Sequence, residues 1–152
     1  MKDAQVAEDV MVSPLVCIEA DEKLPLVEGE LVKAQVGGAP VVSDGKMVGI
    51  ISRSDFVRVP VLLDMLDGYV DEEMKQQPPS ETDQVRRFCD RFADLKVREV
   101  MTTQVISCMR DTPINEIAAS MIDHHVHRVV AIENDEPVGI VESLDLVRLL
   151  AG

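Results

Sequence analysis

The stretch Val48-Gly49-Ile50-Ile51-Ser52-Arg53-Ser54-Asp55 decides the fold, because it belongs to an internal repeat. Its first four residues recur ninety positions later as Val138-Gly139-Ile140-Val141. Three further segments recur at the same offset without a gap: Val10-Met11 as Val100-Met101, Asp21 as Asp111, and Asp55-Phe56-Val57-Arg58 as Asp145-Leu146-Val147-Arg148. A repeat that keeps one register over four segments indicates a duplicated structural unit.

Each unit begins with a predicted strand and a predicted helix. The apolar runs at residues 15–18 and 105–109 favour short strands. In the second unit, apolar residues then follow at helical spacing: Ile114, Ile117, Met121 and Ile122. Asp111 or Thr112 is suited to cap that helix at its N-terminus.

Each unit continues with a predicted hairpin and a second helix. Residues 39–42 and 47–51 are apolar and flank Asp44-Gly45, a pair that favours a tight two-residue turn. A helix begins near Ser54 and another near Leu144. Because one β-α-β-β-α unit is too small to bury its own sheet, we expect an α/β (α+β) fold in which two such repeats pack sheet to sheet with pseudo-twofold symmetry.

The domain boundaries follow from the repeat. We place one domain at residues 6–58, a helical insert at 59–96 and the second domain at 97–152. Residues 61–74 form an amphipathic pattern, and Ser80 could cap a second helix that carries Phe88 and Phe92. The insert either extends the helices of the module or offers a surface for a partner or a second copy.

Composition excludes several classes of function. The net charge is −13, which disfavours binding to nucleic acid and to anionic membranes. No apolar run approaches the roughly 20 residues of a membrane-spanning helix, and the first residues carry no apolar stretch typical of a secretory signal, so a cytoplasmic location is expected. The odd cysteine count argues against a disulfide framework, and we expect Cys17 and Cys108 to be buried thiols.

Catalytic and metal-binding functions find little support. The chain has no GxSxG, no phosphate-binding P-loop and no GxGxxG, so we expect no enzymatic activity. His124, His125 and His127 invite a metal hypothesis, but adjacent side chains point apart and no HExxH or Cys/His pair supports it.

This arrangement resembles the CBS domain family, whose motifs are Gly-x-x-Pro and Gly-h-h-[Ser/Thr]-x-x-Asp, where h is apolar. The first unit matches both, with Gly37-Gly38-Ala39-Pro40 and Gly49-Ile50-Ile51-Ser52-Arg53-Ser54-Asp55, and Val10-Met11-Val12-Ser13-Pro14-Leu15-Val16 is similar to the family's opening segment. The resemblance implies a tandem CBS pair, or Bateman module, that senses an adenine nucleotide such as AMP, ADP or ATP and requires no cofactor.

The resemblance also implies a ligand site, made of Ser13, Val16, Gly38, Ala39, Pro40, Ile51, Ser52, Arg53, Asp55, His127 and Arg128. The Asp55 carboxylate would accept hydrogen bonds from the ribose hydroxyls. Ser52 and the amides that begin its helix would meet a phosphate, and His127 and Arg128 of the second repeat would contact the same phosphate. The alternative is that Ser52 and Asp55 only cap their helix.

The equivalent site in the second repeat keeps Asp145 but carries Glu142 where a phosphate would lie. Its facing loop, Gln35-Val36-Gly37-Gly38, offers no cation. We therefore expect this weaker site to hold nothing or an uncharged adenosine-like group. As a Bateman module the chain is expected to form a homodimer and to regulate an unidentified protein partner. The rival hypothesis is a dimerisation or interaction module that binds no ligand.

Overall fold

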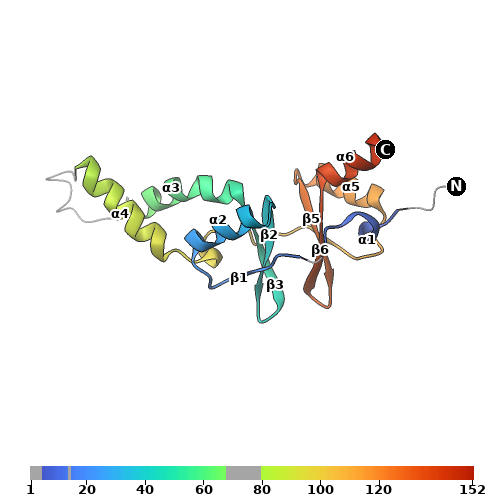
Figure 1. The fold of residues 1–152 in the computed structure, drawn as a ribbon, viewed down its shortest axis with the longest axis horizontal. Coiled ribbons are helices and arrows are strands. Elements are labelled where there is room, and N and C mark those ends of the chain that lie inside the picture. The colour runs from blue at the N-terminus through green and yellow to red at the C-terminus, as the bar shows by residue number, and fades with distance from the viewer. Residues whose placement is uncertain (1–4, 14, 68–79) are drawn as a thin grey trace.

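The computed structural model describes residues 5–13, 15–67 and 80–152 of the chain, and it contains two similar halves (Figure 1). The first half comprises β1 (Ile18–Glu19), α2 (Leu24–Lys33), β2 (Gly38–Ser43), β3 (Lys46–Ser52) and α3 (Arg53–Asp67). The second comprises β4 (Ser107–Cys108), α5 (Ile114–Asp123), β5 (Arg128–Glu133), β6 (Glu136–Glu142) and α6 (Ser143–Ala151). The predicted β-α-β-β-α order is confirmed in both halves.

Each half holds a three-stranded sheet with the same topology. The strand orders are β1-β2-β3 and β4-β5-β6, with a parallel first pair and an antiparallel second pair. The two sheets lie next to each other in the middle of the molecule (Figure 1), and the backbone N–H of Met47 donates to the carbonyl oxygen of Asp135 across them at 2.9 Å. The paired β-α-β-β-α architecture is therefore confirmed.

The two hairpins turn in the same way with different residues. Asp44 and Gly45 have φ values of 52° and 77°, and Asn134 and Asp135 have φ values of 52° and 66°. Positive φ at both central positions is the geometry of the tight hairpin turn that Asp-Gly predicts.

The helical insert agrees with the sequence where the structure describes it. Helix α3 continues through Pro60 to Asp67, and α4 (Glu81–Asp94) follows after residues 68–79, which lie outside the described part, as does the end of the predicted 61–74 pattern. Ser80 caps α4, because its hydroxyl oxygen accepts the N–H of Asp83 at 3.2 Å. Helices α3 and α4 extend away from the sheets (Figure 1).

The segments that precede the two halves are exchanged. Val12 and Ile140 of β6 exchange backbone hydrogen bonds of 2.9 and 3.4 Å, and Thr102 and Ile50 of β3 exchange bonds of 2.9 and 3.0 Å. Helix α1 (Ala7–Val10) accordingly packs on the second half, where Ala7 is fully buried, whereas the short helix η2 (Val97–Glu99) packs on the first. Each half is therefore completed by the segment that precedes the other half, which we call the lead-in of that other half.

Glycine allows a close approach where these lead-ins cross the sheets. A Cβ at Gly49 would lie 2.7 Å from Met101 Sδ and 2.8 Å from the carbonyl oxygen of Thr102, and a Cβ at Gly139 would overlap the side chain of Met11. The repeated Val-Met and Val-Gly pairs are therefore one packing unit, in which a methionine of one lead-in lies over a glycine of the opposite sheet.

Three local expectations were wrong. The strands β1 and β4 are only two residues long, and β1 lies at the end of the predicted run, where Ile18 and Glu19 pair with β2. Cys17 is exposed and Cys108 is half-buried: the neighbour of Cys17, Ile18, takes the inward position of β1. The N-cap of α5 is Pro113, because the Thr112 hydroxyl accepts the N–H of Met109 in the preceding turn instead.

Among the described helices, none has the length and apolar character needed to span a membrane.

Candidate functional site

Asp55 lies in the first turn of α3 and is the most deeply buried charged side chain of the candidate site, with 2% of its surface exposed. Its Oδ2 accepts hydrogen bonds from the Ser52 N–H at 2.7 Å and from the Ser52 hydroxyl at 3.0 Å. Its Oδ1 pairs with the guanidinium of Arg58, one helical turn later. The carboxylate thus caps α3 and is held in a fixed orientation by its neighbours.

Asp55 lines a depression of about 500 Å³, together with Val57, Arg58, Val61, Leu62, Glu99 and Val100. Most of these residues are apolar, so the carboxylate is a polar group in a mainly apolar wall. The depression is shared between α3 and the end of η2, and the exchanged lead-in of the second repeat therefore forms one of its sides. A cavity with an apolar wall and a few polar groups suits a small organic ligand.

The Gly-x-x-Pro segment lies beside this turn. Gly38 is the cross-strand partner of Ser52, and a Cβ on it would lie 2.8 Å from the carbonyl oxygen of Ile51. Ala39 and Ile51 are also paired, and both side chains are buried in the hydrophobic core of the first half, which we call the first core. Pro40 is buried as well. Only backbone groups of Ala39 and Ile51 are therefore available to a ligand.

The first opening segment divides between the two halves. Ser13 follows Val12, which pairs with the second sheet, and Val16 packs on the first core. The lead-in that runs beside β3 is the one that contains Thr102. Arg53 donates its backbone N–H to the carbonyl oxygen of Gly37 at 3.0 Å, while its side chain lines a separate depression of about 440 Å³ with Phe56, Phe88 and Phe92.

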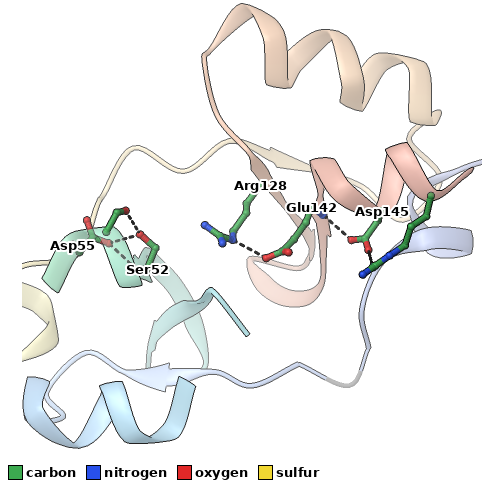
Figure 2. Close-up of polar contacts among 7 residues, drawn as sticks. Ser52, Asp55, Arg128, Glu142 and Asp145 are labelled. Carbon is green, nitrogen blue, oxygen red and sulfur yellow. Dashed lines mark hydrogen bonds and ion pairs between the residues drawn. The ribbon is translucent and has the colours of Figure 1, made fainter. Parts of the chain in front are cut away.

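Arg128 crosses from the second repeat to the first. Its Nε donates to Glu142 Oε1 at 2.7 Å, and the same guanidinium lies against Gly37, where a Cβ would overlap it. In Figure 2 the Arg128 side chain lies between the Ser52–Asp55 pair and Asp145. The side chains of Arg128 and Glu142 are 28% and 34% exposed, so the ion pair is partly shielded from water.

His127 lies elsewhere. It lines a depression of about 410 Å³ with His125, Val126 and Ser143, next to the end of α5. Arg128, by contrast, contacts Gly37 and Glu142. The side chains of His127 and Arg128 therefore do not lie together in this structure, and Arg128 is the one that reaches the first repeat.

The second repeat builds the same turn around Asp145. The Oδ2 of Asp145 accepts the N–H of Glu142 at 2.9 Å, and Oδ1 pairs with Arg148 at 2.9 Å. Glu142 stands at the position that Ser52 has in the first repeat, and it is the cross-strand partner of Arg128. The two turns thus have the same backbone but different charges.

Two features of these sites were missed from the sequence. The pairs Asp55–Arg58 and Asp145–Arg148 have the i, i+3 spacing that allows contact on a helix, and that signal is repeated in the chain. The Arg128–Glu142 pair is set by the register of β5 and β6, which the sequence does not state. In the described parts of the chain, no group of three His, Cys, Asp or Glu residues is placed to hold a metal ion.

The paired sheets, the capped Asp55 and Asp145 turns and the exchanged lead-ins define a tandem repeat module with two related candidate sites. The family model of the CBS domain matches residues 6–62 and 97–152. The chain therefore belongs to the CBS domain family and carries two CBS domains.

Individual known proteins are also similar to this chain over nearly its whole length. The uncharacterised protein MJ1426 of Methanocaldococcus jannaschii is 28% identical over 165 aligned residues, which cover 97% of this chain and 92% of that protein. The solved CBS domain pair of protein MJ0100, in complex with 5'-methylthioadenosine and S-adenosyl-L-methionine, has a TM-score of 0.71 at 22% identity and covers 97% of both chains. The solved structure of CBSX2 in complex with AMP has a TM-score of 0.70 at 16% identity and covers 96% of both chains. At these identities the two solved structures show a shared fold.

Proposed function

We propose that this chain is a regulatory module that binds an adenine nucleotide of the AMP, ADP or ATP type at the Asp55 turn and changes its repeat orientation or partner binding on ligation. The observation that carries the proposal is Asp55: an almost fully buried carboxylate, fixed at the start of α3, lines a mainly apolar depression of about 500 Å³. A fixed carboxylate can accept both hydroxyls of a ribose, and the apolar wall can cover a purine.

The two solved CBS pairs support the choice of ligand class. MJ0100 is bound to 5'-methylthioadenosine and S-adenosyl-L-methionine, and CBSX2 is bound to AMP. All three ligands contain adenosine and differ in what replaces the 5'-hydroxyl. We therefore assign adenosine recognition to the common turn and assign the choice among nucleotides to the charges around it.

Arg128 is the proposed phosphate contact from the opposite repeat. Among the described residues, the Arg128 side chain donates one hydrogen bond, from Nε, and the guanidinium has further N–H groups that could donate to an anion. Its guanidinium lies on Gly37, and the next residue, Gly38, pairs with Ser52. His127 would contact the same phosphate only after its side chain turns from the depression that it lines.

The exchange of lead-ins changes one part of the proposed site. Since Thr102 and Ile50 share two backbone hydrogen bonds, the segment from Thr102 onward runs beside the strand that leads to Ser52 and Asp55. We propose that this segment, rather than Ser13, lies beside the ligand at Asp55. A ligand at Asp55 would then contact both repeats and favour one relative orientation.

The remaining expectations stay part of the proposal. We propose that the module acts without catalysis, in the cytoplasm, as a homodimer, and on a protein partner that the chain does not identify. The described helices carry exposed apolar residues that a second copy could cover, among them Leu144, Val147 and Leu150 of α6.

A second candidate function is an interaction module without a ligand. One observation favours it: the Asp55 carboxylate already has partners in Ser52 and Arg58, and Arg128 already has one in Glu142. Capping and ion pairing would be enough to explain these residues if no ligand bound.

Thermal-shift measurements separate the two candidates. The wild-type chain is melted with AMP, ADP, ATP, adenosine and S-adenosyl-L-methionine. A ligand at a hundredfold excess over its Kd stabilises the folded chain by about 2.7 kcal/mol. We expect AMP, ADP or ATP to raise Tm, Asp55→Ala and Asp55→Asn to remove the shift, and Asp145→Ala to retain most of it. If no adenosine compound raises the Tm of the wild-type chain, the ligand-free module is the better account.

A further inference from the structure

The two repeats differ in chemistry at one pair of equivalent cross-strand positions, which Arg128 and Glu142 occupy in the second repeat. The strand registers pair Gly38 with Ser52 in the first repeat and Arg128 with Glu142 in the second. Both Ser52 and Glu142 donate their backbone N–H to the capping aspartate, at 2.7 and 2.9 Å. One place therefore has a small hydroxyl, and the other has an ion pair.

The side chain of Glu142 begins directly beside the Asp145 turn, because the Glu142 backbone N–H donates to the Asp145 carboxylate. A phosphate there would meet a second anion that is about two-thirds shielded from water. Like charges in such surroundings repel each other more strongly than at an open surface.

Arg128 offsets part of the Glu142 charge, and its guanidinium extends toward the other repeat. The Nε is bonded to Glu142, and the guanidinium lies against Gly37 of the first repeat. Figure 2 shows the pair in line, with Arg128 on the Ser52 side and Glu142 on the Asp145 side. The pair thus presents a cation to one site and an anion to the other.

We propose that Glu142 is the residue that confines phosphate-bearing nucleotides to the Asp55 site, because it places a carboxylate in the Asp145 site and holds Arg128 against the first repeat. The inference rests on the proposed adenosine binding. It deepens that function by naming the class of ligand for each site: a nucleoside phosphate at Asp55 and an uncharged adenosine at Asp145.

Titration calorimetry with AMP and adenosine tests the proposal in a chain whose first site is disabled. The variants are Asp55→Ala alone, Asp55→Ala with Glu142→Ser, and Asp55→Ala with Glu142→Gln. The serine is the residue that the first repeat carries at this position, and glutamine retains an oxygen for Arg128 while it removes the charge. Thermal melting of each variant shows whether it is folded.

We expect Asp55→Ala to bind adenosine but to bind AMP weakly. Adding Glu142→Ser should tighten AMP at least about tenfold, which corresponds to the loss of one like-charge contact, and should change adenosine affinity by less than about threefold. Glu142→Gln should give a smaller gain for AMP. Adding Asp145→Ala to the serine variant should remove the gain, because the new binding is at the second site.

The failures of the two proposals are distinguishable. If the wild-type chain binds neither AMP nor adenosine, the proposed function is wrong and this inference falls with it. If the wild-type chain binds AMP but the serine and glutamine variants gain none over Asp55→Ala, Glu142 does not exclude phosphate. A chain with Asp55→Ala that binds no adenosine would also overturn the inference, because the second site would then hold no ligand at all.

Discussion

Ser52 and Glu142 occupy equivalent positions in the two repeats. The surrounding backbone is alike, but these two side chains give the two sites different chemistry. Both residues precede a helix whose first turn carries an aspartate, and both donate to that aspartate. Ser52 leaves room and a hydroxyl beside Asp55, whereas Glu142 adds a charge and binds Arg128. The two repeats share the fold of the turn but differ in its charges. Two sites with the same backbone can therefore prefer different ligands.

The largest expected difference between the repeats in stability concerns the glycines under the lead-ins. At Gly49 a Cβ would press on the Thr102 carbonyl oxygen, which is bonded to the Ile50 N–H, whereas at Gly139 the three nearest atoms all belong to the Met11 side chain, which can move. Gly49→Ala should lower the free energy of unfolding by about 1–3 kcal/mol, and Gly139→Ala by less. Urea unfolding of the two variants measures this, and an equal or larger loss for Gly139→Ala would contradict it.

A smaller difference is expected between the two capping aspartates. Asp55 is 2% exposed and accepts from Ser52 twice and from Arg58, whereas the side chain of Asp145 is 12% exposed and accepts from Glu142 and Arg148. Asp55→Ala should cost about 1–2 kcal/mol of unfolding free energy, and Asp145→Ala about 0.5–1 kcal/mol. Denaturant unfolding without nucleotide checks the order, and Asn variants serve as controls that keep the side-chain shape.

The smallest expected difference concerns Asp21 and its repeat equivalent Asp111. Hydrogen bonds of 2.8 and 3.0 Å from Arg98 hold the pKa of Asp21 below its usual value. A carboxyl whose pKa is lowered by folding adds stability above its unfolded pKa, about 3.9, and loses it as the pH falls through the folded pKa. Asp21→Asn should therefore destabilise the chain slightly at pH 6, and the difference should shrink as the pH falls below the usual carboxyl pKa of about 3.9.

Asp111→Asn is the matched control, because the ion pairs among the described residues do not include Asp111. At pH 6 the unfolding free energy of Asp111→Asn should lie closer to that of the wild-type chain than that of Asp21→Asn does. A pH dependence equal to that of Asp21→Asn would mean that the Arg98 pair has no part in the effect.

The sequence predicted the features that depend on neighbouring residues. The Asp44-Gly45 turn, the Ser80 cap and the helix that begins after Ser52 all depend on residues a few positions apart, and the structure contains each of them. The repeat also predicted the paired architecture, because a duplicated sequence indicates two copies of one structural unit.

The features that were not predicted depend on contacts between distant segments. The repeat is equally consistent with a lead-in that stays on its own sheet and with one that crosses, so the pairing of Val12 with Ile140 could not be inferred. Arg128 was expected to point freely at a phosphate, but the β5–β6 register places it opposite Glu142. His127, next to it in sequence, lines a different depression.

A crystal structure of the wild-type chain grown with AMP tests the central claim most directly. We expect one AMP per chain at the first site, with both ribose hydroxyls within about 3.2 Å of the Asp55 carboxylate, the phosphate near Arg128, and no AMP at Asp145. Density for AMP at the Asp145 turn with the Asp55 turn empty, or no AMP at either turn, would contradict it.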